Sequence, residues 1–392
     1  MTKSDPISAK GIRTRLVHAG RDPLAHHGFV NTPIYRGSTV LSPTVAHLQS
    51  GEGYVYGTHG TPTTRALEDA WSEISGAAGT VLVPSGLMAI ALALMSVVKT
   101  GDDVLITDSV YRPTRTFCAN VLDRLGVKAR YYDPLIGAGI AALIQPNTSV
   151  IFTEAPGSQS FEIQDIPAIA EQAHRHDICV MMDNTWATPL FFPPHARGVD
   201  LAIEAGTKYL SGHSDLLMGL ISANEKYLPR LKTTFTAFAP CAGPEDVFLA
   251  LRGLRSMELR LKEAERQALQ MAHWLQARPE VLRVLHPALP EDPGHAIWKR
   301  DFSGSSGLFS VVLKPASKAA VAAMLDGLEL FGMGYSWGGF ESLVIPFDCA
   351  SYRTATHWAP GGPTLRFNIG LEDLHDLQAD LDAGFQRLRT TA

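Results

Sequence analysis

The sequence is poor in cysteine, and its cysteines do not occur in pairs. Its 392 residues include four cysteines, and no CxxC motif is formed by them. A disulfide framework or a cysteine-based zinc site is typically signalled by closely spaced cysteines. We therefore expect reduced thiols in the core or at the surface, at Cys118, Cys179, Cys241 and Cys349. No metal site is expected.

The sequence also lacks a hydrophobic run long enough to cross a membrane. Its longest apolar run, residues 87–98, falls short of the roughly 20 residues that a spanning helix needs. The opening residues, MTKSDPISAKGIRTR, contain no apolar core of a signal peptide. We therefore expect a cytoplasmic protein with no membrane partner.

Neither sign of charge is in large excess. The chain has 34 Lys and Arg against 39 Asp and Glu, which gives a formal net charge of −5, and no basic block stands out. Proteins that bind nucleic acid gather Lys and Arg on one face, so no nucleic-acid partner is expected. The length predicts two or three domains, because a single core stops growing well below this size.

From about residue 65, short apolar runs alternate with helical patterns. The runs predict strands within residues 79–86, 102–108, 128–134, 148–156 and 176–185. Helical patterns lie between most of them, at residues 86–98, 114–125, 136–144 and 166–176. Apolar strands separated by helices favour a mostly parallel sheet covered on both faces, and ligands bind such sheets at the carboxyl ends of the strands.

The remaining segments have a different character. Residues 244–280 have the apolar spacing of a long helix, which could connect two domains. Residues 306–314 and 363–370, with a closing helix from Leu371, predict a smaller α+β domain. The first 60 residues contain no long periodic element, so they are either disordered or ordered by wrapping another surface.

Two turns at predicted strand ends could carry chemistry. Pro84, Ser85 and Gly86 stand between a strand and a helix, where free backbone N–H groups and the helix dipole favour a phosphate. The alternative is a plain turn. Asp183 ends another apolar strand, where a carboxylate needs a cation or a protonated ring to face. The alternative is a side chain that caps the next turn.

Lys208 is the only lysine between Lys128 and Lys226, and it stands after an apolar segment in GTKYLSGHSD. A buried lysine has a lowered pKa and can form a Schiff base with a carbonyl compound. Alternatively, its side chain could simply extend to solvent. A phosphate site, a strand-end carboxylate and a Schiff-base lysine together match the needs of pyridoxal phosphate, and Tyr111 could stack on its ring.

The sequence resembles the Cys/Met-metabolism family of pyridoxal-phosphate enzymes along nearly its whole length. The resemblance is carried by these motifs: YGTHGTPTT (56–64), PSGLMAI (84–90), DSVYRPT (108–114), EAPGSQSFEIQD (154–165), MMDNTWATPLFF (182–192), GTKYLSGHSD (206–215), LRGLRSM (251–257), YSWGGFESL (335–343) and LRFNIGLED (365–373). It implies an α/β chain with the aspartate-aminotransferase-like fold of type I pyridoxal-phosphate enzymes. In that fold, a mostly parallel sheet forms the large domain and a smaller α+β domain follows.

The resemblance also implies a role for each matching residue. Lys208 would hold the cofactor as a Schiff base and move protons, with Tyr111 stacking on the ring and also taking part in catalysis. Asp183 would face the ring nitrogen. The remaining contacts would be Gly86, Leu87, Thr207 and Tyr56 for the cofactor, and Arg366, Ser336, Trp337 and Tyr56 for the substrate.

Three regions and an assembly are implied as well. We expect an N-terminal arm over residues 1–60 that contacts a neighbouring subunit, a cofactor-binding domain over 61–255 and a smaller domain over 256–392. The tyrosine matched by Tyr56 would reach a neighbouring subunit's cofactor. The expected assembly is a homotetramer built as a dimer of dimers.

Two positions depart from the family pattern. Many relatives have an arginine for the phosphate where this chain has Thr58, so other donors, such as His59, must serve. Pro156, Gly157, Ser158 and Gln159 replace a Pro-Ala-Asn-Pro sequence that γ-acting relatives commonly carry. This change leaves the usual hydrogen bond to the cofactor's phenolic oxygen unassigned.

The implied activity is a carbon–sulfur lyase reaction, β-elimination of cystathionine in methionine biosynthesis. Trp337 favours this reaction over elimination or replacement at the γ-carbon, because γ-acting relatives more often have leucine there. Those γ-reactions remain alternatives, as does a non-catalytic binding protein on the same fold.

Two other patterns predict less. Ser211, His213 and Asp215 contain the residue types of a hydrolase triad, but three members within five residues rarely converge on one point. His174 and His176 lie two apart in a helical pattern, so they face different directions and do not suggest a metal site.

Overall fold

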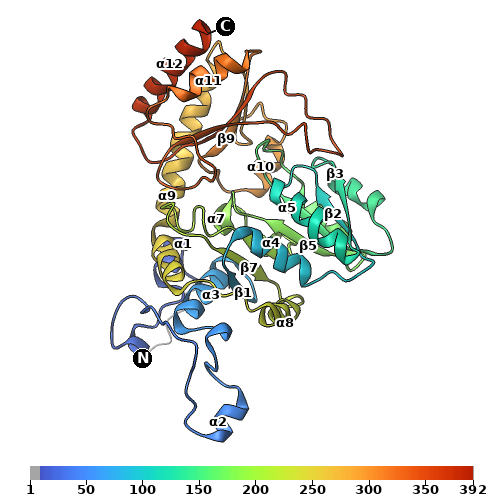
Figure 1. Ribbon diagram of the computed structural model, residues 1–392, viewed down its shortest axis with the longest axis vertical. Coiled ribbons are helices and arrows are strands. Elements are labelled where there is room, and N and C mark those ends of the chain that lie inside the picture. The colour runs from blue at the N-terminus through green and yellow to red at the C-terminus, as the bar shows by residue number, and fades with distance from the viewer. Residues whose placement is uncertain (1–8, 392) are drawn as a thin grey trace.

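A seven-stranded sheet forms the middle of the molecule in the computed structural model, which describes residues 9–391 (Figure 1). Its strand order is β1-β7-β6-β5-β4-β2-β3. The strands are β1 (Gly79–Val83), β2 (Asp103–Thr107), β3 (Lys128–Tyr132), β4 (Thr148–Glu154), β5 (Cys179–Asp183), β6 (Leu201–Glu204) and β7 (Gly219–Ala223). β7 runs antiparallel to β1 and β6, and the other neighbours are parallel. The mostly parallel sheet and the five predicted strands are confirmed.

Both faces of this sheet are covered because its strands are apolar on both sides. In β5, Val180 and Met182 belong to one apolar cluster, and Cys179 and Met181 belong to the cluster on the opposite face. The first cluster includes residues of α3 (Pro62–Ser75), α6 (Ile166–His174) and α7 (Thr188–Phe191). The second includes residues of α4 (Gly86–Met95) and α8 (Leu228–Phe238).

Two predicted helices differ from a regular α-helix. The segment predicted at 114–125 consists of α5 (Arg112–Phe117), a π-helical turn (Cys118–Leu122) and a 3₁₀ turn (Asp123–Leu125). The segment predicted at 136–144 is a 3₁₀ helix (Gly137–Leu143). Gly137 has φ of +50°, outside the range of a right-handed α-helix, so the apolar spacing alone was misleading there.

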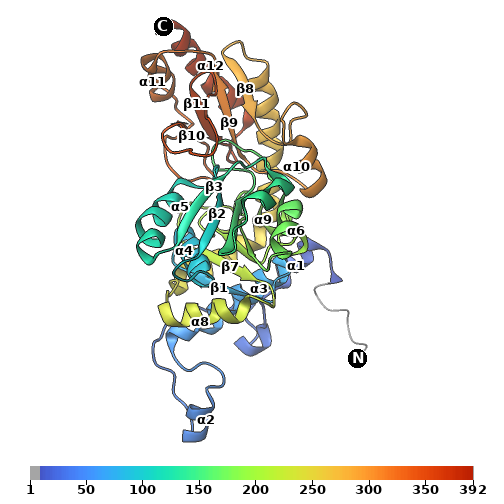
Figure 2. The same cartoon turned by 90° about the vertical axis from the view of Figure 1, so that its right-hand side faces the viewer.

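A second sheet, antiparallel and four-stranded, follows in the C-terminal part (Figure 2). Its order is β10-β11-β9-β8. The strands are β8 (Val281–Leu285), β9 (Leu308–Leu313), β10 (Leu343–Phe347) and β11 (Thr364–Asn368). α11 (Lys318–Asp326) and α12 (Leu374–Thr390) share its apolar cluster, while α10 (His295–Asp301) lies nearer the large sheet. The smaller α+β unit predicted from the sequence is therefore present.

The long helix α9 (Pro244–Gln276) packs on both units. Val247 and Leu261 belong to the apolar cluster beneath the large sheet, and Met271 and Leu275 belong to the cluster of the small sheet. The helix passes residue 255 without a break, so the domain boundaries expected at 60 and 255 remain predictions.

The N-terminal segment, residues 9–60, has few contacts with either sheet. α1 (Ile12–His18) rests on α9, whereas α2 (Val45–Ser50) lies at the tip of a long excursion (Figures 1 and 2). Its strongly exposed apolar side chains include Leu24, Phe29, Val30, Leu41, Val45 and Leu48. Residues 1–8, which include the start of the expected arm and the opening residues considered for a signal peptide, lie outside the described part.

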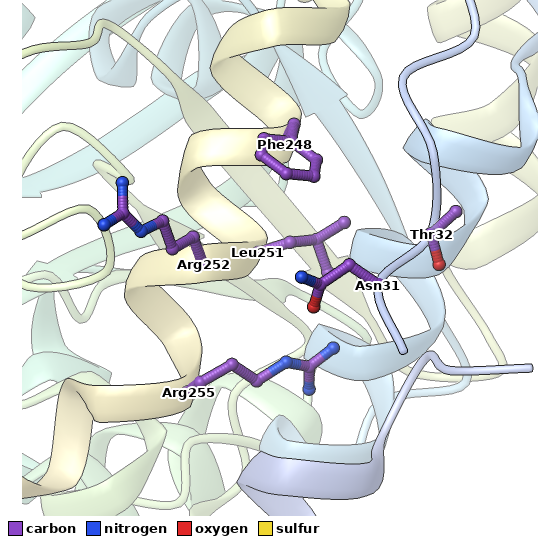
Figure 3. Close-up of a pocket in the computed structure, with 6 residues that line it drawn as sticks. All are labelled: Asn31, Thr32, Phe248, Leu251, Arg252 and Arg255. Atoms are coloured by element: carbon purple, nitrogen blue, oxygen red, sulfur yellow. The ribbon is translucent and has the colours of Figure 1, made fainter. Parts of the chain in front are cut away.

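A cavity of about 290 Å³ separates this segment from α9 (Figure 3). Its lining consists of Asn31, Thr32, Phe248, Leu251, Arg252 and Arg255. Arg255 donates to the carbonyl oxygens of Leu16 (2.6 Å) and Ala19 (2.9 Å), so it fastens the end of α1 to α9. None of the helices in the described part combines the length and apolarity that a bilayer crossing requires.

Candidate active site

Lys208 lies in the turn that follows β6, at the carboxyl edge of the large sheet. Its backbone N–H donates to the carbonyl oxygen of Ala205 (2.9 Å), and its own carbonyl accepts from the N–H of Gly212 (2.8 Å). This compact turn directs the lysine side chain toward the smaller unit. There, Nζ donates to Oγ of Ser336 at 2.5 Å and lies 5.3 Å from the ring centre of Trp337.

The surroundings of Lys208 favour its neutral form. Burial, and then the positive charge of Arg366, lower the pKa of its amine to about 8, against the opposing effect of Asp183. A neutral amine is both a nucleophile toward carbonyl carbon and a base, whereas the ammonium form is neither. The alternative of a lysine extended into solvent does not hold, because the side chain is largely enclosed and hydrogen-bonded.

Asp183 ends β5 beside the lysine turn. Its Oδ1 accepts from the N–H (3.0 Å) and the hydroxyl (2.5 Å) of Thr185. The same hydroxyl accepts from the N–H of Ala205 (2.9 Å), so Thr185 ties Asp183 to the turn that carries Lys208. Burial raises the pKa of Asp183, and the bonds from Thr185 and the charge of Lys208 partly offset that rise. Among the described residues, no partner is recorded for Oδ2, which leaves that oxygen to face a ligand.

The N-terminus of α4 approaches the lysine turn closely. Oγ of Ser85 accepts from the N–H of Met88 (3.1 Å), and the carbonyl of Ser85 accepts from Ala89 (3.0 Å). The N–H groups of Gly86 and Leu87 precede these bonds and have no partner within the helix. A Cβ atom on Gly86 would stand only 2.8 Å from Cβ of Ala205, so this approach requires glycine.

Thr207 adds a hydroxyl next to this helix terminus. Its Oγ1 accepts from the N–H of Met218 (3.0 Å) and lies 3.3 Å from the carbonyl oxygen of the same residue. The first bond fixes the oxygen, and the longer second one leaves its proton available to a stronger acceptor. A phosphate group would be such an acceptor.

Tyr111 follows β2 at the same edge of the sheet. Its backbone N–H donates to Oε2 of Glu154 at 2.7 Å, and Glu154 is paired in register with Asp183 across β4 and β5. Burial, and then the charges of Asp183 and Glu154, raise the pKa of the Tyr111 hydroxyl. Glu154 was missed by the sequence reasoning. The signal was available, because Glu154 ends its strand just as Asp183 ends the next one.

Arg366 comes from β11 of the small sheet and faces the same site. Its Nη2 donates to the carbonyl oxygen of Ser336 at 2.9 Å. Burial lowers its pKa to about 10, which still leaves the guanidinium charged at neutral pH. Its other N–H groups have no recorded partner in the described chain, so they can bind a carboxylate.

Ser336 and Trp337 stand between the lysine and the arginine. Ser336 has φ of +84°, a left-handed value that places its hydroxyl toward Lys208 and its carbonyl toward Arg366. The ring of Trp337 packs at 5.4 Å from that of Tyr209. The structure thus brings Lys208, Asp183, Arg366, Ser336 and Trp337 into one site.

The turn after the lysine supports this site and forms no triad. Nδ1 of His213 lies 2.6 Å from the carbonyl oxygen of Ser211, and the hydroxyl of Ser211 donates to the carbonyl of Thr207 at 3.0 Å. Ser214 donates to Glu341 at 2.5 Å, which fixes the loop that carries Trp337. Within residues 9–391, no group of three or more His, Cys, Asp or Glu side chains could hold a metal ion.

Tyr56 is not joined to this site within the chain. It lies in the N-terminal segment, is 47% exposed and forms an isolated bridge with Thr39. No contact with Lys208 or Arg366 is recorded for it in the described part. Its expected role in a neighbouring subunit remains a prediction.

The donor set fits pyridoxal phosphate. The free N–H groups at the start of α4 and the hydroxyl of Thr207 suit a phosphate, and the unpaired Oδ2 of Asp183 suits a protonated ring nitrogen. The amine of Lys208 suits an aldehyde. Each part of the cofactor therefore has a chemically matched partner at this edge of the sheet.

Comparisons with known proteins agree with this geometry. Cystathionine beta-lyase of Salmonella typhimurium is 42% identical over 395 residues, which cover 97% of this chain and all of the relative. The L-alanine/L-glutamate racemase of Wolbachia pipientis is 40% identical over 390 residues, covering 95% of this chain and 96% of the relative. The crystal structure of cystathionine gamma-lyase from Lactobacillus plantarum in complex with L-serine superimposes with a TM-score of 0.89 and 27% identity, covering 97% of this chain and 100% of that one.

The sequence model for the Cys/Met metabolism PLP-dependent enzymes matches residues 13–386, which include both sheets and every residue that the structure brings to the site. The chain therefore belongs to the Cys/Met metabolism family of pyridoxal-phosphate-dependent enzymes.

Proposed function

We propose that this chain is a carbon–sulfur lyase that carries out β-elimination on cystathionine. The observation that carries the proposal is the position of Lys208, whose amine has a pKa of about 8 and lies between Ser336, Trp337 and the charge of Arg366. The name of the Salmonella typhimurium relative, cystathionine beta-lyase, supports the choice of substrate. The reaction consumes cystathionine and water and yields homocysteine, pyruvate and ammonia.

The residues that would hold the cofactor are those described above. Gly86, Leu87 and Thr207 would bind its phosphate, Asp183 its ring nitrogen, and Lys208 its aldehyde, with Tyr111 against the ring. When bound, pyridoxal phosphate supplies an electron sink for the charge that develops at the substrate's α-carbon.

The chain's own residues would perform the remaining steps. Arg366 binds the α-carboxylate of the substrate through the N–H groups that Ser336 leaves free. The neutral amine of Lys208 then takes the α-proton. As the bond between the β-carbon and sulfur breaks, its electron pair stays on sulfur, and Lys208 or Tyr111 supplies the proton that completes homocysteine. Water hydrolyses the three-carbon enamine to pyruvate and ammonia.

Trp337 is proposed to favour attack at the β-carbon. Its indole lies beside Nζ of Lys208 and is supported by Tyr209, so it narrows the space for the substrate chain. If this is its role, Trp337→Leu will raise the share of 2-oxobutyrate, the product of γ-elimination, relative to pyruvate. An unchanged product ratio would rule out this role for the indole.

The direct test of the main proposal is to incubate the purified protein with cystathionine and identify the keto acid. Pyruvate with homocysteine is the expected result. 2-Oxobutyrate with cysteine would instead assign the chain to the γ-lyases. Methionine γ-lyase and cystathionine γ-synthase activities are checked in parallel with their own substrates.

A second candidate function is amino-acid racemisation. It is favoured by the 40% identity to the L-alanine/L-glutamate racemase and by a site with two proton-carrying groups, Lys208 and Tyr111. Incubation with L-alanine or L-glutamate, followed by chiral chromatography, measures it. Rapid formation of the D-isomer without turnover of cystathionine would favour racemisation over elimination.

A non-catalytic binding protein on the same fold is the remaining alternative. The intact Lys208 and Arg366 count against it. The purified protein should be yellow, and the colour should be lost in Lys208→Ala. A colourless wild-type protein that does not take up pyridoxal phosphate would favour this alternative.

We also propose a cytoplasmic homotetramer built as a dimer of dimers, acting in methionine biosynthesis. The exposed apolar side chains of residues 9–60 support an arm that packs on a neighbouring subunit, where Tyr56 would reach the cofactor and substrate. Sedimentation velocity measures the assembly. A monomer that retains full activity would contradict the arm's role.

A further inference from the structure

Gln159 occupies a strained and firmly held position close to the carboxylate-binding arginine. It lies in the turn that follows β4 and has φ of +67°, in the left-handed region that glutamine rarely adopts. Such a conformation is energetically unfavourable and persists where the surrounding structure fixes it. It often marks a functional position.

The backbone of Gln159 is tied to the small sheet beside Arg366. Its carbonyl oxygen accepts from the hydroxyl of the buried Ser310 at 2.7 Å. Ser310 on β9 is paired in register with Arg366 on β11. Directly opposite residues on antiparallel strands point to the same face with Cβ atoms about 5 Å apart. Gln159 therefore lies next to the face from which Arg366 reaches the substrate.

The side chain of Gln159 is oriented by the segment between β10 and β11. Its Oε1 accepts from the hydroxyl of Tyr352 (3.1 Å) and lies 3.8 Å from the thiol of Cys349. The hydroxyl of Tyr352 also lies 2.9 Å from that sulfur, so the three groups form one cluster. With Oε1 engaged in this way, Nε2 is the end of the amide that remains free to donate.

The connecting segment is hydrogen-bonded to the large unit directly after this cluster. Arg353 pairs with Glu162 at 2.7 Å. Asp108 at the end of β2 accepts from the N–H groups of Thr354 (3.0 Å) and Thr356 (2.7 Å). These contacts fix the segment that orients the Gln159 side chain. None of them involves a residue assigned to the cofactor.

We propose that Gln159 is a substrate-positioning residue whose amide Nε2 donates to the substrate's α-carboxylate beside Arg366. The proposal rests on the function proposed above only in taking an amino acid as the ligand. A neutral donor next to the guanidinium fixes the orientation of the carboxylate without adding charge near Lys208. Ser310, Cys349 and Tyr352 hold the donor in place, and they touch no substrate atom.

The test measures binding of two ligands to the holoenzyme, L-alanine and L-alaninamide, through the absorbance change of the bound cofactor. The two ligands differ only in the carboxylate. Gln159→Leu should weaken L-alanine binding by about tenfold, the value of one hydrogen bond to a charged group, and weaken L-alaninamide much less, because its amide oxygen is a neutral acceptor. Gln159→Glu should weaken L-alanine further, because a second carboxylate repels the first.

Two further variants keep the result interpretable. Tyr352→Phe retains Gln159 but releases its Oε1, so it should weaken L-alanine selectively by a smaller factor, even if Gln159→Leu fails to fold. Gln386→Leu, on the exposed face of α12, is the matched control and should change neither affinity. Equal loss for both ligands, or no loss for either, in Gln159→Leu and Tyr352→Phe would overturn the proposal. Because no elimination is measured, this outcome is independent of whether cystathionine yields pyruvate.

Discussion

The carboxyl edge of the large sheet and the N-terminal segment 9–60 use the same chain in opposite ways. At the sheet edge, charged groups are enclosed and hydrogen-bonded: Lys208 to Ser336, Asp183 to Thr185 and Arg366 to the Ser336 carbonyl. In the N-terminal segment, apolar side chains face outward, as Leu24 (90% exposed) and Leu41 (89% exposed) show.

The difference suggests that the sheet edge serves the chemistry and that residues 9–60 serve the assembly. A single chain already brings Lys208, Asp183 and Arg366 together at this edge. What it leaves uncovered is apolar surface of a kind that is usually buried in a protein interface. Activity should therefore be lost on substitution of single polar residues at the sheet edge. Substitutions in the N-terminal segment should affect activity through the neighbouring subunit.

The strongest test on the sheet edge is Lys208→Ala. Loss of both the covalent anchor and the base should lower the rate of pyruvate formation from cystathionine by about 10³-fold or more. Borohydride reduction followed by mass spectrometry should detect cofactor attached to the wild-type protein and none attached to the variant. Lys226→Ala, at an exposed lysine paired with Asp177, is the control. Retention of most activity in Lys208→Ala would contradict the role of Lys208 as cofactor anchor and base.

A smaller loss is expected for Arg366→Leu. The variant removes the charge that binds the α-carboxylate, so KM should rise by about 100-fold, corresponding to ~2.7 kcal/mol, with a weaker effect on kcat. Arg366→Lys should recover part of the affinity, because it keeps the charge but loses the two-pronged geometry. Steady-state kinetics separate the two constants. An unchanged KM would place the carboxylate elsewhere.

A mixing experiment sharpens the contrast between the two regions. Tyr56→Ala and Lys208→Ala should each be nearly inactive, yet isolated mixed pairs of the two should regain about half of the wild-type activity. The reason is that a mixed pair contains one site with both residues intact if Tyr56 serves its neighbour. Co-expression with two different tags allows the mixed species to be isolated. No recovery would mean that Tyr56 serves its own chain.

The smallest expected effect is a shift in titration. In cofactor-free protein, acylation of Lys208 should increase through pH of about 8, since only the neutral amine reacts and burial holds its pKa there. An ordinary lysine titrates near ~10.4. Arg366→Leu removes a nearby positive charge, so the midpoint should move to higher pH. Peptide mass spectrometry over a pH series gives the midpoint, and an unchanged midpoint would show that the two charges are not coupled.

How much could be predicted from the sequence differs between residues. Gly86, Asp183 and Lys208 could be inferred from strand ends, because parallel strands bring their carboxyl ends to one edge. Arg366 could not, since it comes from the second sheet and only the family resemblance pointed to it. Glu154 could also have been inferred, because it ends its strand as Asp183 ends the next one. The position of Gln159 depends on the register that places Ser310 opposite Arg366, and no local pattern contains that information.

The errors in predicting local structure from the sequence also have physical causes. Residues 137–143 have helical spacing but form a 3₁₀ helix, and Gly137 at its start has φ +50°, outside the α-helical range. The pairing of Thr185 with the lysine turn also escapes a reading of the sequence, because one hydroxyl there serves two strands at once. The roles assigned to individual site residues remain predictions until the variants are measured.

Ser336 makes the two ends of the site thermodynamically dependent on each other. Its hydroxyl holds Lys208 and its carbonyl holds Arg366, both through one residue in a left-handed conformation. If carboxylate binding at Arg366 weakens the hold on Lys208, then release of the lysine must strengthen carboxylate binding by the same factor. Under that condition, carboxylate binding at Arg366 and release of the Lys208 amine are two coupled steps of one equilibrium.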